Sequence, residues 1–224
     1  MHWGRSYLML GLTTAVLGCA AGERRGVVDE SGIAYAEGRA DAPVQVLYFD
    51  DYGCDDCATF AREAVDPLHE QWVKTGRARI EIVDLRWHRG SDAAAAAAAC
   101  AAEQGEFWPM HALLYERQEI WMRAVDVPAK LRGYASSLGL DTVRFRSCAA
   151  DPRHQRRMDA AEELARRWSV RGTPAFVVNG KLYYGSQEWS WVEQLLKEAA
   201  ARDEGSGIGG QGSESGPSSV TSDS

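Results

Sequence analysis

Two cysteines separated by two residues stand where an apolar segment changes into a helical pattern. Val44 to Phe49 reads as a buried strand, and the apolar side chains that follow the cysteines recur at helical spacing. Cys54 is therefore expected at a helix N-terminus, where free backbone N–H groups and the helix dipole stabilise a thiolate. Cys57, one turn further on, is close enough to form a disulfide with it. This placement favours redox chemistry at the CxxC pair.

The alternative for such a pair is half of a zinc site, which needs four ligands. Cys100 and Cys148 stand alone, and the five histidines show no HxxxH spacing. We therefore expect no metal at the pair and no cofactor other than the redox-active disulfide itself.

The N-terminal residues resemble a bacterial export signal. Residues 1–18 carry one positive charge, Arg5, and then an apolar stretch that is too short to be a comfortable transmembrane helix. Val16-Leu17-Gly18-Cys19 resembles a lipobox, in which the cysteine becomes the lipidated first residue. An ordinary signal peptide with an incidental cysteine is the alternative. We expect residues 19–40 to form a lipid-anchored tether and N-terminal extension on a membrane of the bacterial cell envelope.

The remaining cysteines and the charge fit an exported protein. Four cysteines remain besides Cys19, an even number, as expected in an oxidising compartment. Pairing Cys54 with Cys57 leaves Cys100 and Cys148 to form a structural disulfide between two helical segments. The formal net charge of −7 becomes −8 when Arg5 is removed with the signal, which argues against nucleic acid as a partner.

The rest of the chain predicts one α/β domain of residues 41–202. Strands are expected at 44–49, 79–85, 175–178 and 181–184, the last two joined by an Asn179-Gly180 hairpin turn. Helices are expected from the CxxC to Trp72, from a Ser91-Asp92 cap to Gly105, and at 107–119, 129–138, 142–148, 153–168 and 189–201. Residues 203–224 are expected to be disordered, because 13 of the 20 residues from Gly205 onward are glycine or serine.

This order of elements with a CxxC at the first helix is that of a thioredoxin fold, a central mixed sheet flanked by helices, with a helical insertion at about 91–168. The chain resembles the DsbA-like thiol:disulfide oxidoreductases from about Asp41 to Ala201. The stretches that carry the resemblance are Asp41-Ala42-Pro43-Val44 with Asp51-Tyr52-Gly53-Cys54, Ala99 to Trp108 with Met110-His111, Leu138-Gly139-Leu140-Asp141 with Phe145 and Cys148, and Val170-Arg171-Gly172-Thr173-Pro174 with Val178-Asn179-Gly180.

The resemblance implies both a reaction and its partners. Cys54 and Cys57 would pass a disulfide to reduced or misoxidised exported proteins through a mixed disulfide, and a membrane redox partner would reoxidise the pair. A cis Thr173-Pro174 peptide would face the CxxC, with the main chain of Thr173 holding the substrate as an added strand. The same site run in reverse, as a reductase or isomerase, is one alternative. A redox-quiet, lipid-anchored module that binds client proteins is another.

Two positions depart from the family pattern. Family members usually carry an acid six residues before the first cysteine, where it can relay a proton to the second one. Here that residue is Tyr48, which leaves open whether Asp50 or Asp51 reaches the sulfurs. The pair Asp55-Asp56 stands where strongly oxidising members have Pro-His or Pro-Tyr. Its negative charge disfavours a thiolate, so we expect a milder oxidant.

Two histidines compete for a place near the sulfurs. His111 follows Trp108 and Met110 in the inserted helices, and we expect it to be structural rather than a base for Cys54. His88 falls just past the second strand, where lining the edge of the active site is the less favoured of its two interpretations.

Overall fold

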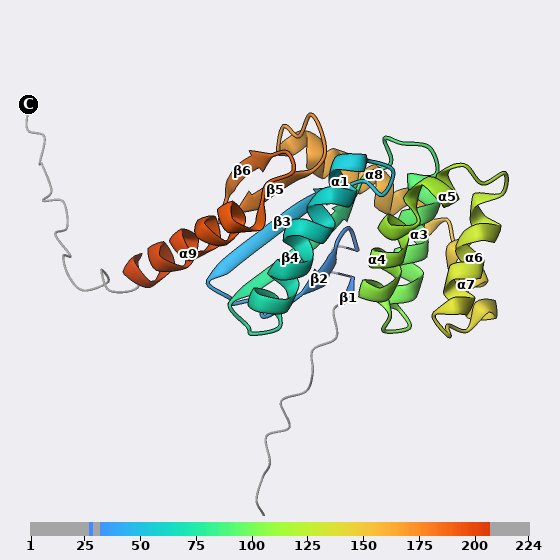
Figure 1. The fold of residues 1–224 in the computed structure, drawn as a ribbon, viewed down its shortest axis with the longest axis horizontal. Coiled ribbons are helices and arrows are strands. Elements are labelled where there is room, and N and C mark those ends of the chain that lie inside the picture. The colour runs from blue at the N-terminus through green and yellow to red at the C-terminus, as the bar shows by residue number, and fades with distance from the viewer. Residues whose placement is uncertain (1–26, 29–31, 207–224) are drawn as a thin grey trace, which may run out of the picture.

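The computed structural model describes residues 27–28 and 32–206 (Figure 1). The expected signal peptide, Cys19, residues 20–26 and 29–31 of the expected tether and extension, and residues 207–224 lie outside the described part. Within the described part, no helix combines the length and the apolar character needed to cross a membrane.

A six-stranded mixed sheet in the order β1-β2-β4-β3-β5-β6 forms the centre of the molecule. Strands β3 (Val44–Asp50) and β4 (Ala78–Asp84) are parallel, and the other neighbouring strands are antiparallel. This is the expected α/β fold, and β3 lies in its interior because both of its faces are covered.

Two short strands precede the predicted start of the domain. They are β1 (Val27–Val28) and β2 (Tyr35–Glu37); β2 pairs with β4, and β1 pairs with β2 and forms the edge of the sheet. A strand of two or three residues is too short to show an alternating pattern, so neither strand is predictable from the sequence.

The predicted hairpin is confirmed. Strands β5 (Ala175–Val178) and β6 (Lys181–Tyr184) are joined by Asn179 and Gly180, both with positive φ, of 44° and 85°. Asparagine and glycine tolerate this conformation, which a two-residue turn of this kind requires.

Helices cover both faces of the sheet. The helix that opens at the CxxC runs through α1 (Asp55–Phe60), a π-helical segment (Ala61–Val65), α2 (Asp66–Leu68) and a second π-helical segment (His69–Val73). It shares one face with the C-terminal helix α9 (Trp189–Ser206), which extends four residues into the stretch expected to be disordered. Helix α8 (Arg153–Arg167) packs on the other face.

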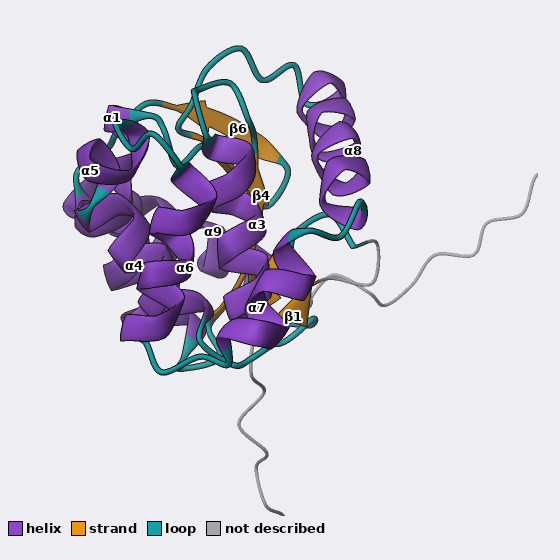
Figure 2. Cartoon of the chain, turned by 90° about the vertical axis from the view of Figure 1, so that its right-hand side faces the viewer, coloured by secondary structure: helices purple, strands orange, loops and turns teal. Residues whose placement is uncertain are grey.

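The insertion places a group of helices beside the sheet (Figures 1 and 2). Its helices are α3 (Ser91–Ala102), α4 (Phe107–Glu116), α5 (Gln118–Met122), α6 (Val127–Ser137) and α7 (Thr142–Ala149), followed by α8. The alanine run forms the buried helix α3, whose small side chains let α4, α6 and α7 approach closely.

Two predicted boundaries in the insertion are wrong. Helix α3 is preceded by Gly90 in the left-handed region, and Ser91 is already helical because its hydroxyl binds the Asp51 carboxylate instead of capping. The predicted helix 107–119 is interrupted at Arg117 (φ −109°, ψ 20°), and Gln118 then begins α5 with its amide bonded to the main chain beside the CxxC.

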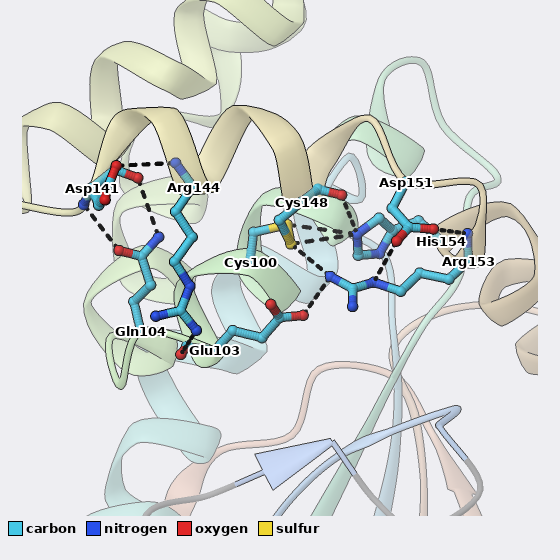
Figure 3. Close-up of a disulfide and its surroundings, with 9 residues drawn as sticks. All are labelled: Cys100, Glu103, Gln104, Asp141, Arg144, Cys148, Asp151, Arg153 and His154. Atoms are coloured by element: carbon cyan, nitrogen blue, oxygen red, sulfur yellow. Dashed lines mark hydrogen bonds and ion pairs between the residues drawn. A yellow bond between two sulfur atoms is a disulfide. The ribbon is translucent and has the colours of Figure 1, made fainter.

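A disulfide between Cys100 and Cys148 joins α3 to α7, with the two Cα atoms 5.8 Å apart (Figure 3). Arg153 and His154 approach it from the start of α8. One Arg153 guanidinium nitrogen lies 3.0 Å from Cys148 Sγ and 2.6 Å from Glu103 Oε1, and His154 Nε2 lies 3.0 Å from the Cys148 carbonyl oxygen.

Replacing both Cys100 and Cys148 by alanine is expected to lower the free energy of unfolding by up to about 4 kcal/mol, because the bridge closes a long loop in the unfolded chain. The two residues are 48 positions apart. Denaturant unfolding without a reducing agent, which leaves the bridge of the wild type intact, would measure the difference. An unfolding free energy equal to that of the wild type would contradict a structural role for this disulfide.

Candidate active site around the Cys54–Cys57 pair

The two cysteines of the CxxC differ in their position on α1. Cys54 is the N-cap residue, with extended backbone (φ −89°, ψ 125°), and Cys57 lies in the first turn. Cys54 is 8% exposed and Cys57 is fully buried, and neither sulfur is in a disulfide in this structure. Only Cys54 can therefore meet a macromolecular substrate.

The Cys54 sulfur is surrounded by hydrogen-bond donors. A hydrogen bond from the Cys57 thiol outweighs the effect of burial and, together with Thr173 and the backbone N–H groups of Cys57 and Asp56, lowers the pKa of Cys54 to about 6. Cys54 is consequently a thiolate at neutral pH. In its thiol form it donates to the Thr173 carbonyl oxygen, 3.4 Å away.

Cys57 has the opposite character. Burial raises the pKa of its thiol far above the ordinary value, and the hydrogen bond to Cys54 and the charge of Cys54 raise it further. Cys57 is therefore held as a neutral thiol that donates to Cys54. The two sulfurs thus differ both in access and in acidity.

A buried carboxyl group reaches the inner sulfur through a tyrosine. The Tyr48 hydroxyl is a hydrogen-bonding neighbour of the Cys57 thiol and donates to Asp50 Oδ1 at 3.2 Å. Tyr115 of α4 donates to the same oxygen, and Asp50 Oδ2 has no hydrogen-bond partner. The question that the sequence left open is answered for Asp50, because side chains two residues apart on a strand point to the same face.

Asp50 is held as a neutral acid near neutral pH. Burial raises its pKa to about 8, and the charge of Asp84, its register neighbour on β4, adds to the rise. The hydrogen bonds from the two tyrosines lower the pKa but offset only part of this rise. A protonated carboxyl group next to Tyr48 and Cys57 can supply a proton to a thiolate formed on Cys57.

Asp51 does not reach the sulfurs and instead organises the loops around them. Its buried carboxylate accepts hydrogen bonds from the backbone N–H groups of Gly53 (2.8 Å), Trp87 (2.8 Å) and His88 (3.2 Å) and from the Ser91 hydroxyl. His88 Nδ1 lies 3.0 Å from Asp51 Oδ2. His88 therefore lines the edge of the active site, which is the interpretation that the sequence favours less.

Gly53 and Gln118 complete the frame. A Cβ atom at Gly53 would lie 2.4 Å from the His88 Cβ and 2.8 Å from the Ser91 Oγ, so only glycine allows this approach. The Gln118 amide donates to the carbonyl oxygens of Tyr52 (2.8 Å) and Cys54 (2.9 Å). The inserted helices thereby hold the turn that carries Cys54.

The remaining predicted residues are placed as follows. The Thr173-Pro174 peptide is cis and its Thr173 carbonyl faces Cys54. His111 is buried in α4 with Nδ1 2.9 Å from the Tyr52 hydroxyl, and burial lowers its pKa to about 3, so it is a neutral structural residue.

The site also contains residues that sequence reasoning missed. Tyr115, Gln118 and Ser91 come from the insertion and carried no local signal that placed them at the CxxC. Among the described residues, the group of three potential metal ligands consists of Cys100, Cys148 and His154, and two of these are joined in a disulfide. The CxxC has no third ligand in this part of the chain.

Comparison with known proteins is consistent with this geometry. The thioredoxin family profile matches residues 31–198. The Na(+)/H(+) antiporter NhaA 3 of Salinispora tropica is 37% identical over 153 residues, which are 67% of this chain but 22% of that protein. Disulfide bond formation protein D of Bacillus subtilis is 23% identical over 72% of this chain and 74% of its own length. The crystal structure of Wolbachia pipientis alpha-DsbA1 has the same fold, with a TM-score of 0.69 at 16% identity over 77% of this chain and 94% of its own.

Alkylation of the reduced protein is expected to label Cys54 first, with a rate that is half-maximal near pH 6, because the thiolate is the nucleophile. Mass mapping after iodoacetamide treatment at several pH values measures this. Cys57→Ala, which removes the largest cause of the low pKa, should move the half-maximal pH upward. Labelling of Cys57 before Cys54 at neutral pH would contradict the assignment.

Asp50→Asn is expected to stabilise the protein at neutral pH. The pKa of Asp50 is raised from 3.8 to about 8 on folding, so its stabilising contribution is present below the lower value and is lost as pH rises toward the upper one. Asparagine removes this loss, and the free energy of unfolding at pH 8 should rise by about 1–4 kcal/mol, with little change at pH 4.

Denaturant unfolding at the two pH values measures this effect, with the exposed Asp92→Asn as the matched control. A variant that is less stable than the wild type at pH 8 would show that the Asp50 carboxylate, rather than its neutral form, is the native species.

Proposed function

Since this chain belongs to the DsbA-like thioredoxin family of thiol:disulfide oxidoreductases, we propose that it passes a disulfide from its Cys54-Cys57 pair to the cysteines of exported proteins. The observation that carries the proposal is the difference between the two sulfurs. An accessible sulfur with a pKa of about 6 lies against a buried sulfur of raised pKa and a proton donor.

The proposed reaction has two exchange steps, beginning with the oxidised pair. A substrate thiolate attacks Cys54 Sγ, the Cys54–Cys57 bond breaks, and its electron pair remains on Cys57. A second substrate thiolate then attacks the substrate sulfur of the mixed disulfide, and Cys54 leaves as a thiolate. The substrate gains a disulfide and the CxxC pair is left reduced.

Asp50 and the low pKa of Cys54 each assist one of these steps. In the first step, Cys57 is a poor leaving group because its pKa is raised. The Tyr48 hydroxyl, which donates to Asp50 in this structure, would turn to give its proton to Cys57 and take the Asp50 proton in exchange, which favours the break. In the second step, Cys54 leaves readily because its own pKa is low. The first step therefore depends on the groups around Cys57, and the second step depends on the low pKa of Cys54.

The pKa of Cys54 supports a milder oxidant than the strongest family members. Its value of about 6 lies between about 7 in thioredoxin and about 3.5 in DsbA. A less stabilised thiolate corresponds to a less oxidising disulfide. Asp55 and Asp56, the two exposed acids at the start of α1, act in the same direction.

The Thr173 main chain is the proposed docking edge for substrate. Its carbonyl oxygen lies 3.4 Å from Cys54 Sγ, so an extended substrate segment bound there as an added strand would present its cysteine to Cys54. A module that only binds clients would need this edge, but it would have no use for the acidity difference between the sulfurs or for the buried proton donor.

Export and anchoring are proposed from the sequence. The apolar signal at residues 1–18 and the lipobox-like Cys19 support attachment to an envelope membrane, facing the periplasm or the exterior. A membrane redox partner would then return the CxxC to its disulfide form, and the reaction would use no cofactor beyond the two sulfurs.

The proposal is tested by adding the oxidised protein to a reduced, unfolded test protein that has native disulfides and following disulfide formation. The wild type is expected to accelerate it, and Cys54→Ser to lose the effect. Cys100→Ala/Cys148→Ala, which leaves the CxxC intact, is the matched control and should keep it. Equal rates for wild type and Cys54→Ser would reject enzymatic activity and favour the client-binding alternative.

The direction of electron flow is decided by equilibrating the pair with mixtures of reduced and oxidised glutathione. An equilibrium that keeps the pair oxidised only under strongly oxidising mixtures supports a disulfide donor. A pair that remains a disulfide even in strongly reducing mixtures would be a poor donor and would contradict this direction.

A further inference from the structure

His88, a histidine from outside the CxxC motif, lies against the turn that carries Cys54. It belongs to the loop between β4 and α3, and its side chain is about half exposed. Its Cβ atom would be 2.4 Å from a Cβ atom built on Gly53, the residue directly before Cys54. The absence of a side chain at position 53 is what lets the imidazole approach the start of α1.

The imidazole is fixed in place by a buried carboxylate. Asp51 is fully buried and binds both the backbone N–H of His88 (3.2 Å) and its ring Nδ1 (3.0 Å). The same carboxylate binds the backbone N–H of Gly53 at 2.8 Å. One anion therefore ties the ring of His88 and the turn that carries Cys54 to the same point.

The charges around His88 favour its protonated form. Partial burial, which lowers a histidine pKa, is outweighed by the hydrogen bond and charge of Asp51 and by the charges of Cys54 and Asp55, so the pKa of His88 is raised. These groups come from the turn before α1 and from α1 itself, the elements that face the ring.

We propose that His88, positioned by Asp51, is the cation that stabilises the Cys54 thiolate, a role that the Asp55-Asp56 pair within the motif cannot fill. The inference rests on the proposed function and adds an electrostatic group to the same site. It assigns Asp51 as a positioning residue, because its carboxylate acts on Cys54 only through His88 and the Gly53 turn.

The proposal accounts for a tension within the site. Two acidic residues in the first turn of α1 oppose a negative charge at Cys54, yet the pKa of this thiol is about 6. Hydrogen bonds from Cys57 and the helix N-terminus act from inside the protein. His88 adds a positive charge on the loop side, near the sulfur that leaves as a thiolate when the mixed disulfide is resolved.

The test compares His88→Gln and His88→Lys. Glutamine keeps a polar side chain without the charge, and lysine keeps a cation at every pH used. The pH titration of thiolate absorbance in the reduced protein gives the pKa of Cys54. We expect His88→Gln to raise this pKa by about half to one unit, so that the glutathione equilibrium moves about threefold to tenfold toward a less oxidising pair, and His88→Lys to restore both values.

Arg89→Gln is the matched control, since it removes a charge one residue away whose guanidinium binds the carbonyl oxygens of Met122 and Ala124. It should leave the pKa of Cys54 unchanged. Because the His88 ring binds the buried Asp51, its variants are expected to unfold at a lower temperature than the wild type, and circular dichroism checks that they are folded at the temperature of the titration.

An unchanged Cys54 pKa in His88→Gln, or a failure of lysine to restore it, would overturn the inference even if the wild type oxidises the test protein. A pKa that rises in His88→Gln and returns in His88→Lys supports it even if the wild type fails that assay, in which case only the proposed function is lost.

Discussion

The buried carboxylate of Asp51 is the interaction on which the arrangement of this molecule depends. A charged group removed from water costs several kcal/mol unless it is hydrogen-bonded, so its donors cannot be given up singly. These donors come from the turn after β3, the loop after β4 and the first residue of α3. The sheet, the CxxC helix and the insertion are therefore joined at one point, next to the turn that carries the reactive cysteine.

Asp50, the neighbouring residue, is also buried, but as a neutral acid. Its side chain receives hydrogen bonds from two tyrosines, but one carboxyl oxygen remains without a partner and the proton is retained near neutral pH. Asp84, which faces it on β4, is instead paired with the buried Arg157 of α8. The two acids lie opposite each other on paired strands, but only Asp84 has a cation that balances its charge. The uncompensated acid costs stability and is the one next to the sulfurs.

The features that the sequence predicts well are those set by local chemistry. The CxxC at a strand-to-helix junction, the Asn179-Gly180 turn and the helical periods each follow from residues that are neighbours along the chain. Contacts across the chain were not predictable in this way. The Ser91 hydroxyl binds the carboxylate of Asp51, 40 residues earlier, instead of capping α3. The Gln118 amide, just after the break between α4 and α5, donates to the carbonyl oxygen of Cys54. His88 was placed in the right loop, but only its partner Asp51 shows which way the ring is held.

The spacing of Tyr48 and Asp50 has a consequence for how relatives of this domain are compared. The two side chains leave β3 on the same face, and the tyrosine hydroxyl has both the Asp50 carboxyl group and the Cys57 thiol as hydrogen-bonding neighbours. An alignment column that demands an acid six residues before the first cysteine would score this chain as lacking one. Equivalence in such proteins is better judged by the face of the strand and by a hydrogen-bonding side chain that links the acid to the inner sulfur. A search built on that criterion would recover members in which the acid has moved by one strand repeat.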